Sequence, residues 1–170
     1  MLRLTSRIAL SAALSAALLL PAATSAPAGA TPIVNGHGQW ATPVGTIGFQ
    51  VSVVALPDGT LQGSGISTNH NETGVHWFHF EVLEYARSGD DVIVMGLIDQ
   101  AFNAPGFLGT KTVLVIRDDG QGTASQDRAL SASGLPTWVT LDLLLNAPPP
   151  MVIPPPQFWF PLQSGNFEIH

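Results

Sequence analysis

Apolar and polar residues alternate with a period of two along the middle of the chain. Between residues 46 and 56 every second position is apolar, starting at Ile47 and Phe49. This period is typical of a strand with one buried face, whereas an amphipathic helix repeats every 3.6 residues. Pro57-Asp58-Gly59 then favours a tight reversal, so a returning strand is predicted over residues 60–68.

Three more strands are predicted beyond this hairpin, over residues 75–86, 92–101 and 110–117. The second and third are apolar on both faces, which is typical of strands in the centre of a sheet. Polar turns separate the strands, including one over residues 69–74. A last strand is predicted from Asn166 to His170, whereas residues 141–145 fit either a strand or one helical turn.

This succession of strands predicts an all-β fold, either a single antiparallel β-sandwich or a small β-barrel of about eight strands. Gly63 and Gly65 lie on one face of a predicted strand, which indicates a bend or the close approach of another element. Residues 31–170 are expected to form a single domain, because a chain of about 100 to 200 residues usually builds one core.

The first 30 residues have the three parts of a secretory signal peptide. Arg3 and Arg7 precede an apolar run from Ile8 to Leu20, and a stretch of small residues follows as far as Ala30. The run is shorter than the roughly 20 residues that a membrane-spanning helix needs. We therefore expect cleavage after Ala30, no stable membrane span in the mature chain, and a secreted or periplasmic location.

Charge excludes some partners. The chain carries 6 basic and 12 acidic residues, and loss of Arg3 and Arg7 leaves four basic residues and a net charge of −8. Four basic side chains can supply little binding free energy through contacts with phosphate groups. The charge therefore argues against nucleic acid and anionic membranes as partners. The chain contains no Cys, so the core must hold the fold without disulfides.

Residues 147–156 are rich in proline and lack the amide donors that a central strand needs. Such a segment either binds an aromatic groove on a partner or forms a rigid loop at one end of the domain, and we adopt the loop interpretation.

Three of the five histidines, His70, His76 and His79, lie within ten residues. Imidazole is a common metal ligand and proton carrier. On a strand, however, His76 and His79 point to opposite faces and cannot close on one ion. His79 and Glu81 share a face and could form an acid–base pair. The other interpretation makes them surface residues of a half-solvated strand.

The loop from Asp118 to Asp127 is acidic and glycine-rich. Asp118, Asp119 and Asp127 supply the oxygen ligands that Ca²⁺ prefers, although their spacing is not that of an EF-hand. The alternative is a hairpin turn whose aspartates accept backbone amides, with Asp127 paired to Arg128 or Arg117. No other cofactor is predicted.

The four tryptophans, Trp40, Trp77, Trp138 and Trp159, could line a cleft for a sugar or an apolar ligand, or could serve as core packing. The chain lacks the nucleophile elbow, the zinc-protease motif, the phosphate-binding loop and any cysteine nucleophile.

Several turn motifs occur in a characteristic order: Gly36-His37-Gly38, Asp58-Gly59 followed by Gly63, Gly96 inside an apolar strand, the turn at residues 118–122 before Asp127, and the final run from Gly165 to His170. In this order the chain resembles a family of small exported bacterial all-β domains of the post-COAP-1 type. The resemblance implies a compact barrel or sandwich and an extracytoplasmic location, and it implies no reaction. Relatives often carry a pair of Cys that this chain lacks.

Together these features predict a non-catalytic extracytoplasmic module that binds a small molecule, a glycan or a protein through a barrel mouth or a loop, or that has a structural role. One alternative is a small β-barrel enzyme, an isomerase or hydrolase, that uses His79 and Glu81 inside a cavity. The other is an adhesive module stabilised by Ca²⁺ at residues 118–127.

Overall fold

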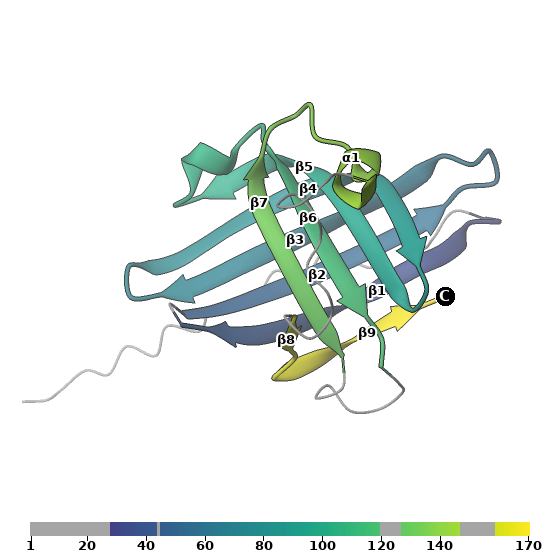
Figure 1. The fold of residues 1–170 in the computed structure, drawn as a ribbon. Coiled ribbons are helices and arrows are strands. Elements are labelled where there is room, and N and C mark those ends of the chain that lie inside the picture. The colour runs from purple at the N-terminus through teal and green to yellow at the C-terminus, as the bar shows by residue number, and fades with distance from the viewer. Residues whose placement is uncertain (1–27, 44, 120–126, 147–158) are drawn as a thin grey trace, which may run out of the picture.

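A computed structural model of the chain describes residues 28–43, 45–119, 127–146 and 159–170. Nine antiparallel strands form one sheet that curls into a barrel-like shape (Figure 1). The elements in chain order are β1 (Thr31–Thr42), β2 (Gly45–Ala55), β3 (Leu61–Asn71), β4 (Gly74–Ser88), β5 (Asp91–Phe102), the 3₁₀ helix η1 (Pro105–Phe107), β6 (Lys111–Arg117), β7 (Arg128–Leu135), α1 (Leu141–Asn146), β8 (Phe160–Pro161) and β9 (Ser164–Ile169).

The strands follow the order β8-β7-β6-β5-β4-β3-β2-β1-β9. β1 to β7 are therefore a simple meander, and the C-terminal segment reaches both of its edges. β8 pairs with β7 and β9 pairs with β1. Between them, the amide of Leu162 donates to the carbonyl of Asp127 and the amide of Gln163 to that of Gln39. The all-β prediction is confirmed, and a single curled sheet corresponds to the barrel alternative.

Several boundaries differ from those predicted. β1 and β7 were not predicted, because the inner positions of β7 include Ser131 and Ser133 in place of large apolar residues. The turn predicted over residues 69–74 is much shorter, because β3 runs on to Asn71 and β4 begins at Gly74. Residues 141–146 form a helical turn, so the helical alternative was the right one.

Aromatic rings fill the interior of the barrel. Trp40 stacks on Phe49 at 5.5 Å between ring centroids, and Phe49 lies 6.4 Å from both Phe78 and Phe80. We call this the packed interior; its buried members are Ile33, Val34, Trp40, Phe49, Val51, Val53, Phe78, Phe80, Val82, Val92, Val94, Ile98, Leu114, Ile116, Ala129, Leu162 and Phe167.

Phe80 explains two glycines. It is fully buried, and its ring occupies the space that a Cβ would take at Gly65 on β3 and at Gly96 on β5. The glycines therefore let a large ring lie flat against the two neighbouring strands. At Gly65, the glycine pattern correctly indicated the close approach of another element, and that element is the ring of Phe80. At Gly63 a Cβ would lie 2.6 Å from the carbonyl oxygen of Ser52 on β2.

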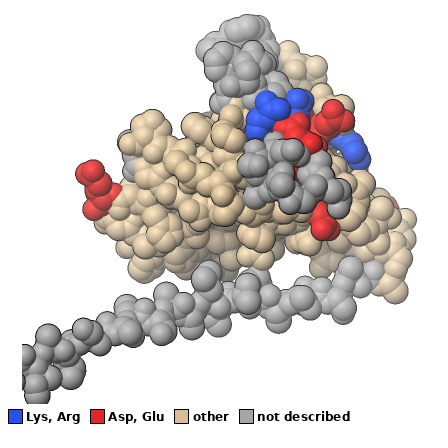
Figure 2. All heavy atoms as spheres, turned by 90° about the horizontal axis from the view of Figure 1, so that it is seen from below, with Lys and Arg blue, Asp and Glu red and all other residues tan. Residues whose placement is uncertain are grey.

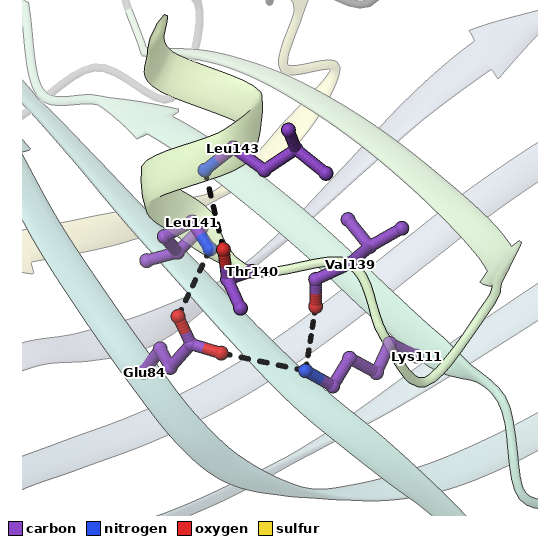
Figure 3. Close-up of polar contacts among 6 residues, drawn as sticks. All are labelled: Glu84, Lys111, Val139, Thr140, Leu141 and Leu143. Carbon is purple, nitrogen blue, oxygen red and sulfur yellow. Dashed lines mark hydrogen bonds and ion pairs between the residues drawn. The ribbon is translucent and has the colours of Figure 1, made fainter. Parts of the chain in front are cut away.

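The outer face of β5 and β6 is also covered, as the two apolar faces of these segments predicted. Ile93, Met95, Val113 and Val115 pack against a layer that contains Val139, Leu141 and Trp159. Polar contacts attach this layer to the sheet (Figure 3). Nζ of Lys111 donates to the carbonyl of Val139 at 2.6 Å and lies 3.4 Å from Glu84, whose other oxygen accepts the amide of Leu141 at 2.9 Å.

In the part of the chain that the structure describes, no helix has the length and apolar character needed to cross a membrane. The predicted signal peptide, apart from residues 28–30, and the proline-rich segment at residues 147–156 lie outside the described residues.

Candidate functional site

The β3–β4 turn and the β5–β6 loop lie at one end of the barrel (Figure 1). Residues of this end line a cavity of about 300 Å³. We call it the mouth cavity. Eight of its twelve described lining residues are polar, and they come from four strands and two connections: Ile47, Ser67, Asn69, Asn71, Thr73, His76, Phe78, Asn103, Ala104, Phe107, Ser131 and Ser133.

Strand geometry places the polar residues on the inner face. Alternate residues of β3 point inward, so Ser67, Asn69 and Asn71 continue the face that begins with Gly63 and Gly65. His76 pairs with Asn69 across the β3–β4 ladder and Phe78 pairs with Ser67. Every one of these side chains therefore enters the same space.

The rim of the cavity is a hydrogen-bonded network. Oδ1 of Asn71 accepts the amide and the hydroxyl of Thr73, at 2.9 and 2.6 Å. The Thr73 hydroxyl also lies 2.9 Å from Nε2 of His76. Nδ1 of His76 donates to the carbonyl of Asn103 at 2.7 Å, since a carbonyl can only accept. The network joins the β3–β4 turn to the β5–β6 loop and holds the opening in shape.

Below the rim, one polar atom has no partner. Oδ1 of Asn69 is buried and accepts no hydrogen bond from the described residues. Such a group costs free energy in a folded protein unless a ligand or water satisfies it. Ser67 beside it is also buried, at 5% exposure. Ser133, on the opposite wall, shares a 2.9 Å hydrogen bond with Thr112.

Two aromatic rings form the apolar part of the wall. Phe78 and Phe107 lie 5.9 Å apart between ring centroids and are tilted by 45°. Phe78 belongs to the packed interior, whereas Phe107 is 37% exposed in η1. The cavity therefore lies between the buried core and solvent.

The lining residues that the structure describes include no Asp, Glu, Lys or Arg. Charges pair elsewhere: Arg117 forms two hydrogen bonds with Asp91, at 2.6 and 2.9 Å, and Arg128 bonds Asp119 at 2.8 Å. In the view of Figure 2, most blue and red atoms gather in one area of a surface that is otherwise mainly uncharged. The described lining of the mouth cavity therefore contains no carboxylate, ammonium or guanidinium group.

His79 and Glu81 do not enter the cavity. They alternate with the buried Phe78, Phe80 and Val82 and therefore lie on the outer face of β4. His79 bonds a carboxylate there, but it is that of Asp99, at 2.6 Å from Nδ1. The structure thus separates His76 from His79, as the strand spacing predicted, and brings neither His79 nor Glu81 to a described cavity.

The acidic loop is only partly described, because residues 120–126 lie outside the described part. Asp127 is buried, and its Oδ2 accepts the amide of Phe167 at 3.0 Å. Burial raises the pKa of the Asp127 carboxyl. The predicted pairing of Asp127 with Arg128 or Arg117 is not formed, since these pair with Asp119 and Asp91. The described residues contain no group of three metal-ligating side chains, and Ca²⁺ binding by the whole loop stays a prediction.

None of the four tryptophans lines the mouth cavity. Trp40 is in the packed interior and Trp159 is buried in the outer layer, with the Arg117 guanidinium 5.6 Å from its ring centroid. Trp77 stacks on Phe102, at 6.2 Å between centroids, and Trp138 is 66% exposed. For Trp40 and Trp159 the packing interpretation was right.

Comparison of the chain with protein-family models, with curated proteins and with solved structures found no match. The resemblance to small exported bacterial domains therefore stays a prediction, and the function must be argued from the site.

Sequence reasoning missed the mouth cavity because its lining is spread over several elements. One signal was present: Ser67, Asn69 and Asn71 follow Gly63 and Gly65 at every second position. An inward face that changes from glycine to small polar residues indicates a space that the chain itself does not fill.

Proposed function

We propose that this protein is a non-catalytic, exported binding module, and that its ligand is a small molecule held in the mouth cavity. The observation that carries the proposal is a cavity of about 300 Å³ whose wall includes Asn69, a residue whose buried Oδ1 has no hydrogen-bond partner among the described residues. That volume is at the lower end of the range for small-molecule sites, about 300–1,000 Å³.

The chemistry of the lining supports binding and not catalysis. General acid–base catalysis needs a titratable group placed to accept or donate a proton. His76 is the sole titratable side chain of that kind among the lining residues within the described ranges, and both its ring nitrogens already contact the rim. The ring is therefore engaged in shaping the opening.

The first experiment is a fragment screen by ¹⁵N–¹H NMR with small neutral, acidic and basic compounds. We expect some fragments to shift the amide signals of Ser67, Asn69 and Ser133. The variant Ser131→Phe places a ring in the cavity and should abolish these shifts. Ser64→Phe, on the exposed face of β3, is the matched control and should preserve them.

A panel in which no compound shifts these amides would contradict the proposal. So would shifts that persist in folded Ser131→Phe, because the binding site would then lie elsewhere.

Export is proposed from the first 30 residues and has its own test. Expressed in a bacterial host, the protein should appear outside the cytoplasm as a chain that starts at Thr31, measured by intact mass. A full-length cytoplasmic chain would contradict export and leave the binding proposal standing.

A further inference from the structure

We propose that the ligand of the mouth cavity is a neutral, hydroxylated ring of monosaccharide size. The inference rests on the proposed function, and it names the class of ligand that the same site takes. Three properties of the lining lead to it: the absence of charge, the unmet acceptor at Asn69, and the aromatic wall.

The first property is charge. A charged ligand would lose water on entering the cavity, and such a loss is compensated only by an opposite charge or several strong hydrogen bonds. Among the described residues, the lining offers no Asp, Glu, Lys or Arg to supply that charge. The site therefore favours a ligand without net charge.

The second property is the buried amide of Asn69. Its Oδ1 has no donor among the described residues and almost no exposed surface. A small turn of the side chain would bring the amide to a neutral hydroxyl group of a ligand in the cavity. A hydroxyl also accepts, so it would satisfy the amide nitrogen equally well if the side chain turned over. The hydroxyls of Ser67 and Ser131 in the same wall have this dual capacity. A hydrocarbon would leave Asn69 unsatisfied.

The third property is the pair of aromatic rings. Phe78 and Phe107 present an apolar surface on a wall that also carries serine, asparagine and threonine side chains. A saturated ring with hydroxyls at its edge and C–H groups on its face fits such a surface: the face packs against the rings and the edge meets Asn69 and the serines. At about 300 Å³ the cavity suits one such ring.

The test compares matched probes by the same NMR titration. The neutral probes are glucose, galactose and mannose; each is paired with its uronic acid, which is anionic, and its amino sugar, which is cationic. Cyclohexylmethanol has a ring of equal size and a single hydroxyl group, and it is the probe that lacks the remaining hydroxyl groups of the sugar. We expect at least one neutral hexose to bind about tenfold or more tightly than its charged partners and than cyclohexylmethanol, which corresponds to the loss of one or two hydrogen bonds or of charge solvation.

Variants of Asn69 test the proposed contact. Asn69→Leu has nearly the same shape and should lose at least tenfold in hexose affinity, the effect of one strong hydrogen bond. Its melting temperature should equal or exceed that of the wild type, because the unsatisfied buried amide is gone. A purely structural Asn69 would lower the melting temperature instead. Asn35→Leu, at an exposed position of β1, should leave hexose binding unchanged.

Asn69→Asp is the second variant and keeps the shape of the side chain. The added negative charge should move the preference from the neutral hexose to the amino sugar. This variant keeps the proposal falsifiable if Asn69→Leu does not fold.

The outcomes separate the two proposals. Fragments that bind while no neutral hexose does would overturn the ligand class and leave the binding function standing. Tighter binding of a uronic acid, an amino sugar or cyclohexylmethanol would also overturn it. If no compound of any kind reaches the cavity, both proposals fail.

Discussion

The inner face of β3 has two different halves. At Gly63 and Gly65 the strand has no side chain, and the space beside Gly65 is filled by the ring of Phe80. At Ser67 and Asn69 the side chains are small and polar, and a cavity remains. Both halves follow the same alternation on the same strand. A strand therefore needs no continuous apolar face to form part of a barrel, provided that a neighbouring strand supplies the missing volume in one half.

The packed half should carry most of the stability. Phe80→Ala removes a fully buried ring and should lower the free energy of unfolding by about 3–5 kcal/mol. Ser131→Ala, in the mouth cavity, should change it by less than about 0.5 kcal/mol. Urea denaturation of both variants measures the difference. If both variants lost the same free energy of unfolding, the packed half and the mouth cavity would contribute equally to stability.

The substitution Gly65→Ala should cause the next largest loss in the free energy of unfolding. Its methyl group would clash with the ring of Phe80, and overpacking of this kind costs about 1–3 kcal/mol. Gly106→Ala is the control, since a Cβ there meets no atom within 4 Å. Adding Phe80→Leu to Gly65→Ala should recover part of the loss in the same urea titration, and strictly additive losses would contradict the clash.

Two aspartates at the end opposite the mouth should respond to pH with opposite signs. Burial raises the pKa of Asp127 above its ordinary value of 3.8, so the folded state holds this proton more tightly than the unfolded state. Its contribution to stability is complete below pH 3.8 and is lost as the pH rises through the folded pKa. Hydrogen bonds from Thr60 lower the pKa of Asp58, so its contribution exists above pH 3.8 and is lost as the pH falls.

Asp127→Asn keeps an acceptor for the amide of Phe167 and cannot ionise. It should be more stable than the wild type at pH 7, with the advantage shrinking as the pH falls towards 3.8. Thermal unfolding over this range measures it. An advantage that does not change with pH would mean that the charge of Asp127 is not the cause.

The smallest expected effect is on ligand affinity, and it comes from comparing two turns with the same hydrogen bonds. Thr73 bonds Asn71 at the mouth, and Thr60 bonds Asp58 at the other end, in each case through its amide and its hydroxyl. Thr73→Val should weaken binding of a hexose or fragment by roughly two- to tenfold, because the rim loses a hydrogen bond. Thr60→Val should leave that affinity unchanged. If both variants lost affinity equally, the hydrogen bonds of the rim would not be the cause of the weaker binding.

Much of the fold could be predicted from the sequence, because alternation records burial directly. Ile47 and Phe49 indicate β2, and the doubly apolar run from Val92 to Ile98 indicates a central strand. β1 and β7 were missed, because glycines and serines take inner positions there and the alternation fades. The site could not be predicted, because Asn69, His76 and Ser131 come together only when the sheet curls.

The pairing of β9 with β1 brings Ile169 opposite Val34. The first strand of the sheet therefore acquires its second neighbour only from the last residues of the chain. This pairing joins residues that lie far apart in the sequence. Closing so long a loop is slow compared with forming the hairpins of the meander. We therefore expect the pairing of β9 with β1 to be one of the last steps of folding.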